Sequence, residues 1–431
     1  MIAQQEKYTV TLEEMNNLGN AVCHIDGMVV FVLGGVTGDV AEIEITKLYP
    51  KYALAKIVKI NTPSPLRVKR ECNAYGCGGC AFLNVSIAEE NRIKREYVKS
   101  VLKKSKIDAD VADVACPVDR KYRNKIVLFW NGTAFGYKKQ KSNEIVKHER
   151  CILNDEIFDR IARFTEENIE DKRHLVALFM RKSSAKTPEI TVCPIFSRES
   201  DILKYASELV NEFPSITGVI LGISTEKEFV LEKCNFKTLY GEKKLKDRLC
   251  SLDFEISPKA FYQVNHACAE LLYEKAIELA DATKDSSVAD LFCGTGTIGI
   301  ILASKTGASV IGVEIEPSAV SDAKRNAQIN KIKNIEFFEG DAKNFDRRVD
   351  ICIVDPPRKG LSSFMTETLL RLKPQRIVYV SCNPDTLARD IALLAKEYNL
   401  SSKVYPFNMF PKTAHIESVV CLTRHNELPL A

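Results

Sequence analysis

The chain has 431 residues, with 61 Lys and Arg against 57 Asp and Glu and a formal net charge of +4. At about 100–200 residues per domain this length predicts two to four domains, and the 45% hydrophobic and 27% charged content excludes a disordered chain. No apolar run reaches the ~20 residues that a bilayer requires, and the N-terminus lacks the layout of a signal peptide. We therefore expect a cytoplasmic protein whose 14 cysteines act as thiols, metal ligands or catalytic groups rather than as disulfides.

The N-terminal residues 7–60 alternate between apolar and polar positions and are broken by glycines, which predicts about five short strands. Strands of this number and length suit a small barrel of the OB type, which commonly binds single-stranded nucleic acid. A purely structural β domain fits the pattern equally well. The run NTPSP (61–65) carries two prolines in three positions and is predicted to be a linker. The first domain is accordingly predicted to span residues 1–62.

The central residues 66–255 are predicted to form an α+β domain. A helical period at 86–105 follows Ser86, a plausible N-cap. Between residues 66 and 150, 19 Lys and Arg stand against 10 Asp and Glu. This excess is typical of a surface that binds a polyanion, although most such runs are simply solvated. Strand-like runs follow, namely IVLFW (126–130), LVALFM (175–180), EITVCPIF (189–196) and GVILGI (218–223).

From residue 256 the pattern changes to nearly continuous apolar runs separated by helical segments. Such runs are typical of parallel strands buried on both faces of a doubly wound sheet. Residues 256–431 are therefore predicted to form an α/β domain of the class I, Rossmann-like kind. The predicted strands are VADLF (288–292), VIGVEI (310–315), IEFFEG (335–340), VDICIVD (349–355) and RIVYVS (376–381).

A nucleoside-binding pattern follows the ends of these strands. The first strand leads into DLFCGTG (290–296), where glycines let the backbone approach a ligand, although many α/β folds use such glycines only to turn. The next strands end at Glu314, Asp341 and Asp355. Glu314 is placed to accept ribose hydroxyls and Asp341 to reach an adenine amino group. Because the third glycine of G-x-G-x-x-G is missing, the pattern favours S-adenosylmethionine over NAD.

Two candidate reacting groups lie near the last strands. Cys382 follows the fifth strand in VSCNP (380–384), and Glu417 precedes the closing strand SVVCLT. Most buried cysteines are merely small hydrophobic residues, and Glu417 could be a solvated edge residue. However, methylation of C5 of a pyrimidine needs a thiolate that adds to C6 and a base that removes the C5 proton. We therefore interpret Cys382 as the nucleophile and Glu417 as the base.

These motifs resemble those of the bacterial RNA uracil-5-methyltransferases, within them the 23S ribosomal RNA branch with a TRAM domain and an iron–sulfur cluster. The resemblance implies that residues 1–62 form the TRAM domain and that the helix near 86–110 packs against the catalytic domain. It also implies methylation of C5 of a uridine in structured RNA, with 23S rRNA as the favoured substrate and the target base taken out of its stack. The matching segments are FYQVN (261–265), DLFCGTG (290–296), DPPRKG (355–360), SCNPDTLARD (381–390) and HIE (415–417).

The resemblance also implies roles for individual residues. Cys382 becomes the nucleophile and Glu417 the proton acceptor. We expect a monomer whose partner is structured RNA and which makes no membrane contact. The residues implied to contact S-adenosylmethionine are Gln263, Phe292, Thr297, Glu314, Asp341 and Asp355.

A cysteine cluster matches the place where the family binds a [4Fe–4S] cluster. Three close thiols with a remote fourth suit such a cluster, whereas zinc ribbons pair two C-x2-C knuckles. This chain has four residues between its first two cysteines where the family has five, which keeps zinc as the alternative. In the family the cluster takes no part in methyl transfer. The predicted ligands are Cys72, Cys77, Cys80 and Cys151.

Basic residues near the cysteine cluster are candidate contacts to RNA phosphates, although any one of them is more often solvated surface. Each phosphate contact would make binding dependent on salt. The candidates are Lys121, Arg123, Lys125, Lys138, Lys139 and Lys141.

Three other functions compete with this interpretation. A tRNA uridine-5-methyltransferase would share the same motifs. A 5-methylcytidine enzyme generally has a second cysteine in a Pro-Cys motif after strand four, where this chain has DPP (355–357). A non-catalytic RNA-binding or assembly protein would explain the β domain, the basic segment and the cysteines, but not the cofactor pattern together with the thiol and the acid.

Overall fold

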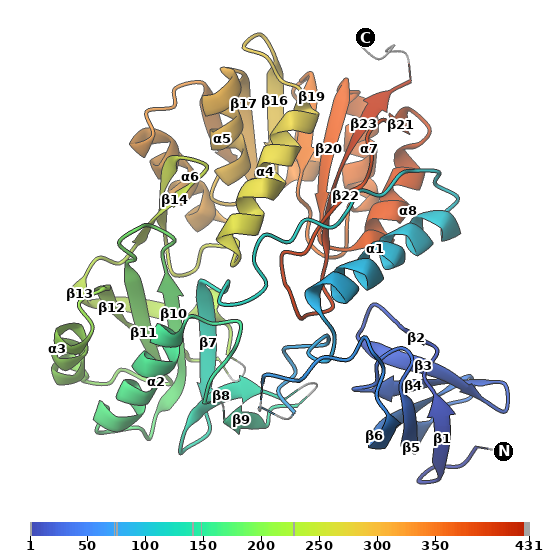
Figure 1. Ribbon diagram of the computed structural model, residues 1–431. Coiled ribbons are helices and arrows are strands. Elements are labelled where there is room, and N and C mark those ends of the chain that lie inside the picture. Colours follow the sequence, from blue (N-terminus) through green and yellow to red (C-terminus); the bar gives the residue numbers. More distant parts are fainter. Residues whose placement is uncertain are drawn as a thin grey trace.

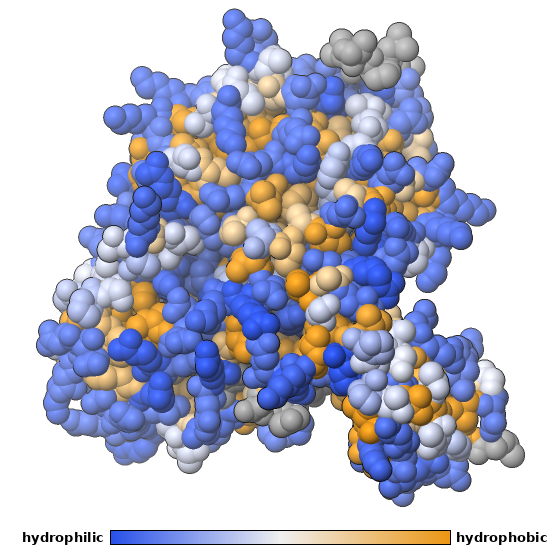
Figure 2. Space-filling model, in the orientation of Figure 1, coloured by the Kyte–Doolittle hydropathy of each residue, from blue (hydrophilic) through white to orange (hydrophobic). Residues whose placement is uncertain are grey.

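The computed structural model describes residues 2–72, 74, 76–139, 142–147, 149–226 and 229–425. The chain forms three parts, an N-terminal β domain, a central α+β domain and a C-terminal α/β domain (Figure 1). The surface in Figure 2 is mostly hydrophilic, with hydrophobic residues exposed in the middle of this face. Among the described residues, no helix is long and apolar enough to cross a bilayer.

The N-terminal domain is one curled six-stranded sheet in the order β1-β5-β6-β4-β3-β2. Its inner face follows the predicted alternation, because Ala41, Ile43 and Ile45 are buried on β5 while the residues between them are not. The predicted linker starts later than expected. Asn61 and Thr62 still belong to β6, where Thr62 pairs with Val40 of β5, since a strand end tolerates a following proline. The strands are β1 (Lys7–Thr11), β2 (Glu14–Met15), β3 (Asn20–Ile25), β4 (Met28–Leu33), β5 (Val40–Leu48) and β6 (Tyr52–Thr62).

Helix α1 (Ile87–Lys104) joins the N-terminal and C-terminal domains. It begins where predicted, because the Ser86 side chain accepts a hydrogen bond from the Glu89 N–H at 3.2 Å. Ile93 packs into the core of the β domain, while Val98 and Val101 pack into the core of the C-terminal domain. The helix therefore shares its apolar residues between two domains.

The central domain is a seven-stranded sheet in the order β13-β12-β11-β10-β7-β8-β9. All four predicted strand runs lie in this sheet, and two helices pack against it. A two-stranded hairpin then leads into the C-terminal domain and packs into its core. The elements are β7 (Lys125–Trp130), β8 (Phe135–Lys138), β9 (Ile145–Lys147), α2 (Glu156–Asn168), β10 (Leu175–Lys182), β11 (Ile190–Phe196), α3 (Leu203–Glu212), β12 (Ile216–Ile223), η1 (Leu231–Lys233), β13 (Asn235–Gly241), β14 (Leu245–Leu249) and β15 (Leu252–Ile256).

The C-terminal domain is a doubly wound sheet in the order β18-β17-β16-β19-β20-β23-β21, with β22 also paired to β23. The first five of these strands run parallel, and β23 runs antiparallel to β20. Each predicted run forms a strand, which confirms the α/β prediction. The strands are β16 (Ser287–Leu291), β17 (Ser309–Glu314), β18 (Ile335–Glu339), β19 (Ile351–Val354), β20 (Arg376–Ser381), β21 (Tyr398–Leu400), β22 (Tyr405–Phe407) and β23 (Glu417–Arg424).

Helices cover the sheet and connect its strands, so its core lies between strands and helices on both sides. The chain reverses its direction of winding between β16 and β19. Ligands bind at such a switch point, beyond the carboxyl ends of the strands. The helices are α4 (His266–Ala280), α5 (Thr297–Thr306), α6 (Pro317–Ile329), η2 (Ala342–Asn344), α7 (Ser363–Leu372) and α8 (Pro384–Leu394).

Candidate active site

A cavity of about 610 Å³ lies at the switch point. It collects residues from the ends of β16, β17, β18, β19 and β20 and from the start of β23. Seven of the eight predicted catalytic and cofactor residues line it, the exception being Thr297. Its lining is Phe261, Gln263, Phe292, Gly294, Val313, Glu314, Ile315, Gly340, Asp341, Ala342, Asp355, Pro356, Pro357, Arg358, Cys382, Phe410, His415 and Glu417.

The turn after β16 bends sharply to form one wall of the cavity. Phe292 has a left-handed backbone with φ of 67°, an unusual conformation for a residue with a side chain. Hydrogen bonds from the N–H groups of Phe292 and Cys293 to the Val313 carbonyl, at 3.0 and 3.1 Å, hold this backbone against β17. At Gly296 φ is 78°, and an added Cβ would lie 2.6 Å from the Phe337 ring. Glycine is therefore required at 296.

The acids after β17 and β18 also organise the loops around them. One oxygen of Glu314 accepts the Gly294 N–H at 3.0 Å, and the other accepts the N–H groups of Ile315 and Glu316. Asp341 caps η2 and forms an ion pair with Lys343 at 2.8 Å, and this lysine lowers the pKa of the Asp341 carboxyl. Both carboxylates line the cavity, at the strand ends to which the sequence pattern assigned them.

Two further acids lie at the base of the site. Burial raises the pKa of Asp290 to about 7, and burial together with Asp290 raises that of Asp355 to about 7 as well. Thr297 does not line the main cavity. It lines a smaller adjoining hollow of about 30 Å³ together with Asp290 and Asp355. Thr297 is the first residue of α5, directly after the glycine turn, and its side chain is buried.

Gln263 carries a polar atom that lacks a protein partner. Its side chain is buried, with 6% exposed, and its Oε1 accepts no hydrogen bond. The backbone is fixed from the central domain, because Asn124 donates a side-chain hydrogen bond to the Gln263 carbonyl at 3.0 Å. A buried orphan oxygen at a cavity wall is expected where a ligand supplies the missing donor. The residues therefore fit S-adenosylmethionine, which offers hydroxyl and amino donors.

Cys382 and Glu417 are brought together by strand pairing. In the antiparallel pair of β20 and β23, Ser381 lies opposite Ser418. The next positions toward the cavity are therefore Cys382, just after β20, and Glu417, at the start of the neighbouring strand β23, and both residues line the cavity. Both pKa values are shifted. Burial and then the Asp355 charge raise the pKa of Glu417 to about 8, and burial with the charges of Glu417 and Asp355 raises that of Cys382 to about 11.

The structure adds three residues to which the sequence motifs assigned no role. The Arg358 guanidinium acts against the pKa rise that burial and the neighbouring acids cause, because it lowers the pKa of both Cys382 and Glu417. It also lies 3.2 Å from Nε2 of His415, whose pKa is lowered by burial and by Arg358. Phe410 lines the cavity and packs edge-on against His415. The DPPRKG and HIE motifs contain the first two residues, whereas no local signal marks Phe410.

The four predicted cluster cysteines influence one another electrostatically, but in the part of the chain that the structure describes they are not assembled as a metal site. Burial and the charges of Cys151, Cys77 and Cys72 raise the pKa of Cys80 to about 12. Four thiols have the right chemistry for a cluster. Among the described residues, however, no group of three or more His, Cys, Asp or Glu side chains is placed to hold a metal ion. The [4Fe–4S] prediction is therefore not confirmed.

The basic residues predicted to contact phosphates lie in different surroundings. Lys121 and Lys139 form ion pairs with Glu156 and Glu144, both at 2.9 Å. Burial lowers the pKa of Lys125 to about 8. Arg123 is largely enclosed beside the cysteines, while Lys138 lies 4.8 Å from the centre of the Phe129 ring. Lys141 lies outside the described residues.

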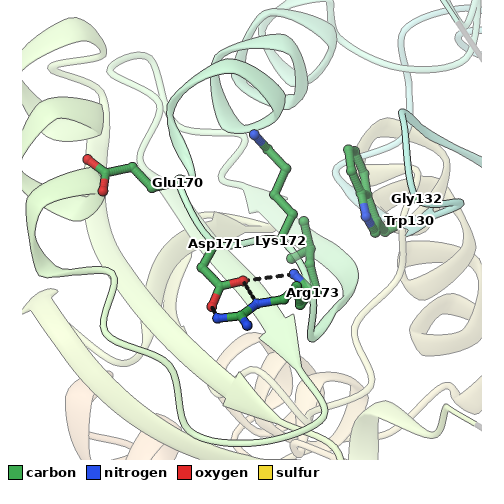
Figure 3. A pocket seen from close by; sticks show the side chains of 7 residues that line it. Trp130, Gly132, Glu170, Asp171, Lys172 and Arg173 are labelled. Carbon is green, nitrogen blue, oxygen red and sulfur yellow. Dashed lines mark hydrogen bonds and ion pairs between the residues drawn. The ribbon is translucent and has the colours of Figure 1, made fainter.

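A second hollow, of about 840 Å³, lies on the central domain (Figure 3). Both of its acids are already paired, because Asp171 forms an ion pair with Arg173 at 2.7 Å and Glu170 forms one with Lys204 at 2.8 Å. It contains none of the predicted site residues. We therefore assign the chemistry to the cavity of the C-terminal domain.

The fold and the cavity together define an S-adenosylmethionine-dependent methyltransferase that acts on RNA. The chain belongs to the tRNA (uracil-5-)-methyltransferase family, whose model matches residues 189–425. A TRAM domain model matches residues 4–58, which agrees with the curled N-terminal sheet.

Relatives match over nearly the whole chain. An RNA methyltransferase of Clostridium tetani is 31% identical over 99% of this chain and 98% of its own length. One of Oceanobacillus iheyensis is 32% identical over 98% and 97% of the two chains. A solved structure, the Pyrococcus abyssi tRNA (uracil-54, C5)-methyltransferase in complex with S-adenosyl-L-homocysteine, is 27% identical, with a TM-score of 0.78 over 96% of this chain and 100% of that one.

Proposed function

We propose that this protein methylates C5 of a uridine in structured RNA, with 23S rRNA as its substrate, through a covalent bond between Cys382 and C6 of the base. The observation that carries the proposal is the pairing of β20 with β23. It sets a thiol beside a buried carboxyl in the cavity that also contains Gln263, Glu314 and Asp341. A 5-methylcytidine enzyme would need a second cysteine after β19, where the cavity has Pro356 and Pro357.

The first step is the loss of the thiol proton to solvent and the addition of the Cys382 thiolate to C6. This makes C5 a nucleophile, because the electron pair of the C5–C6 double bond moves toward the C4 carbonyl as an enolate. Glu417 and Asp355 oppose thiolate formation, and Arg358 favours it. Arg358 therefore stabilises the reactive form of the nucleophile.

S-adenosylmethionine, when bound, supplies the methyl group that C5 takes. Gln263, Glu314 and Asp341 line the part of the cavity proposed to hold it, with Asp355 near the reacting groups. After transfer, Glu417 takes the proton from C5, the C5–C6 double bond forms again and the Cys382 thiolate leaves. A carboxyl whose pKa is about 8 is a stronger base than an ordinary one, and this value lies close to neutral pH.

The choice of RNA is part of the proposal. The TRAM domain and the basic segment at 66–150 support a large structured RNA. The solved relative is a tRNA enzyme, so tRNA is the second candidate. The [4Fe–4S] cluster on Cys72, Cys77, Cys80 and Cys151 stays a prediction, with zinc as its alternative, and it has no role in the steps above.

The proposal is tested by trapping. Purified protein, S-adenosylmethionine and transcripts of 23S rRNA fragments or tRNA containing 5-fluorouridine are incubated and separated on a denaturing gel. Because fluorine cannot leave as a proton, we expect a covalent band with rRNA that requires both Cys382 and the cofactor. A band with tRNA alone would change the substrate, and no band with either RNA would overturn the reaction.

A variant of Glu417 tests the base separately. Glu417→Gln should form the adduct on ordinary uridine and release it slowly, because no group accepts the C5 proton. The measurement is the fraction of RNA that stays bound to protein in denaturant over time. Release at the rate of the unchanged protein would remove Glu417 from this role.

A further inference from the structure

A buried ion pair lies on α1, outside the C-terminal sheet. Nζ of Lys94 lies 2.9 Å from Oε1 of Glu90, and the two side chains are 1% and 0% exposed. Burial lowers the pKa of Lys94, and the Glu90 charge opposes this effect. An enclosed pair of this kind contributes little net stability, because removing two charges from water is costly. A role in fixing one arrangement of the chain is the alternative use of such a pair.

The pair contacts a loop that follows β22. Glu90 accepts hydrogen bonds from the Lys412 N–H and the Asn408 side-chain amide, both at 2.9 Å. Lys94 donates to the Asn408 side chain at 2.7 Å. In the sequence Glu90 and Lys412 are 322 residues apart. We call residues 408–413 the clamped loop.

Other segments of the chain also form hydrogen bonds with the clamped loop. The N–H groups of Ala81 and Phe82 donate to the Lys412 carbonyl at 2.6 and 3.1 Å. The Tyr122 hydroxyl donates to the carbonyl of Pro411, and Asn265 donates to that of Met409. Phe82 itself packs in the core of the N-terminal β domain. The loop is therefore bound from α1, from the segment next to the TRAM domain and from the start of α4.

The centre of the loop is strained. Lys412 has a φ of 68°, in the left-handed region that residues with side chains rarely adopt. Its N–H, its carbonyl and its ammonium group are all engaged, the last of them 3.6 Å from Oε2 of Glu90. Strain of this kind persists only where surrounding contacts determine the conformation. Glu90 provides two of these contacts.

Both ends of the clamped loop lead to the proposed base. The loop starts after Phe407, which pairs with Glu417 across β22 and β23, and the chain returns through His415 to Glu417. Between these ends, Phe410 lines the cavity. A shift of the loop would therefore move Phe410 and the backbone that carries Glu417.

We propose that Glu90 is a positioning residue for methyl transfer, acting through the clamped loop on Phe410 and Glu417. The inference rests on the proposed function, since it adds to the same site a residue that holds the proposed base in position. It also makes the active site composite, because the loop takes its shape only when α1 and the 81–82 segment are docked. Displacing a reacting group by about 1 Å can cost about 10²-fold in rate.

The test compares three variants of the full chain. Glu90→Ala removes every contact that the Glu90 side chain makes with the clamped loop, and Glu90→Gln keeps an acceptor oxygen but loses the charge. Glu89→Ala is the matched control, because Glu89 is the neighbouring buried acid of α1 and, among the described residues, its side chain pairs only with Arg92 on the same helix. We expect kcat to fall about 10²-fold in Glu90→Ala, with a smaller fall in Glu90→Gln and no change in the control.

A role in packing alone would give a different result. We expect the KM for RNA and the affinity for S-adenosyl-L-homocysteine to stay within about twofold of the unchanged protein, because the cofactor residues are not on the clamped loop. A folded Glu90→Ala with unchanged kcat would overturn the inference, and so would a loss confined to KM or cofactor affinity. If Glu90→Ala does not fold, Glu90→Gln decides by the same criteria.

Hydrogen exchange separates this inference from the proposed function. The Lys412 amide should be protected in the unchanged protein and exchange faster in Glu90→Ala, whatever reaction the enzyme performs. Equal protection in both would refute the clamp. Absence of uridine methylation by the unchanged protein, with the protection difference intact, would refute the proposed function and leave the clamp standing.

Discussion

The cavity of the C-terminal domain and the four predicted cluster cysteines are both sets of reactive side chains from distant parts of the chain, yet they are held in place differently. In the cavity, the reactive groups stand at the ends of strands whose neighbours are set by backbone hydrogen bonds. The four cysteines lie outside the named helices and strands, and among the described residues they are not gathered to hold a metal ion.

The difference teaches that a sheet can form a reactive site before any ligand arrives, whereas a set of loop-borne thiols depends on its ligand. Buried thiols must lose protons to bind metal, and that cost is met by the metal itself. The high pKa of Cys80, about 12, agrees with thiols that stay protonated without a metal. The following predictions test this contrast.

The largest effect is expected from the nucleophile. Cys382→Ala should lower turnover by at least about 10³-fold and leave binding of S-adenosyl-L-homocysteine unchanged, since the thiol is not among the predicted cofactor contacts. Cys250→Ala is the control, because Cys250 is also partly buried and burial raises its pKa to about 11 as well. Methylation assays and titration calorimetry measure the two quantities. Normal turnover by Cys382→Ala would contradict a preformed thiol site.

The next largest effect is expected from a substitution of Gly296 in the turn after β16. Gly296→Ala places a Cβ 2.6 Å from Phe337 at a φ of +78°, so we expect a loss of about 1–3 kcal/mol in unfolding free energy and weaker cofactor binding. Gly27→Ala is the matched control, with the same φ of +78° and no atom within 4 Å. Urea unfolding and calorimetry give both values. Equal losses in the two variants would assign the effect to backbone strain alone.

Burial of Glu417, the proposed base, should lower the stability of the folded protein at high pH. The pKa of Glu417 is about 8 in the folded chain and 4.5 as its ordinary value. The folded state therefore binds the extra proton, so this contribution to stability is full below pH 4.5 and is lost as pH rises through 8. Glu417→Gln should thus melt a few degrees higher than the unchanged protein at pH 8.5 and equally at pH 4.5, by calorimetry. Exposed Glu336→Gln should show no such pH dependence.

The smallest effect on turnover is expected from substitutions of the four predicted cluster cysteines. Anaerobic supply of iron and sulfide should give protein that binds both and melts at a higher temperature, because a site that closes around its metal adds the binding free energy to folding. Cys80→Ala should lose the metal and the added stability while changing kcat little. Elemental analysis distinguishes iron from zinc. Protein that binds neither metal would remove the cluster from this chain.

Much of the fold could be predicted from local patterns. Periodic burial marks strand β5 and helix α1, and a capping serine marks where that helix begins. The positions of Glu314, Asp341 and Asp355 follow from one rule, that parallel strands end at one edge of a sheet. Thr297 was the exception, since it follows the glycine turn and lines the smaller hollow. The linker also begins later than predicted, because β6 continues to Thr62, which pairs with Val40 of β5.

By itself the sequence determined the doubly wound sheet, the positions of the acids that follow its strands, and the identities of Cys382 and Glu417 as thiol and acid near strand ends. Local periodicity and residue chemistry are sufficient for these conclusions. Only the tertiary structure decided that Ser381 pairs with Ser418, that Oε1 of Gln263 has no protein partner and that Glu90 holds Lys412. The physical reason is that pairing register, burial and contacts across hundreds of residues depend on how the whole chain packs, and no short stretch of sequence carries that information.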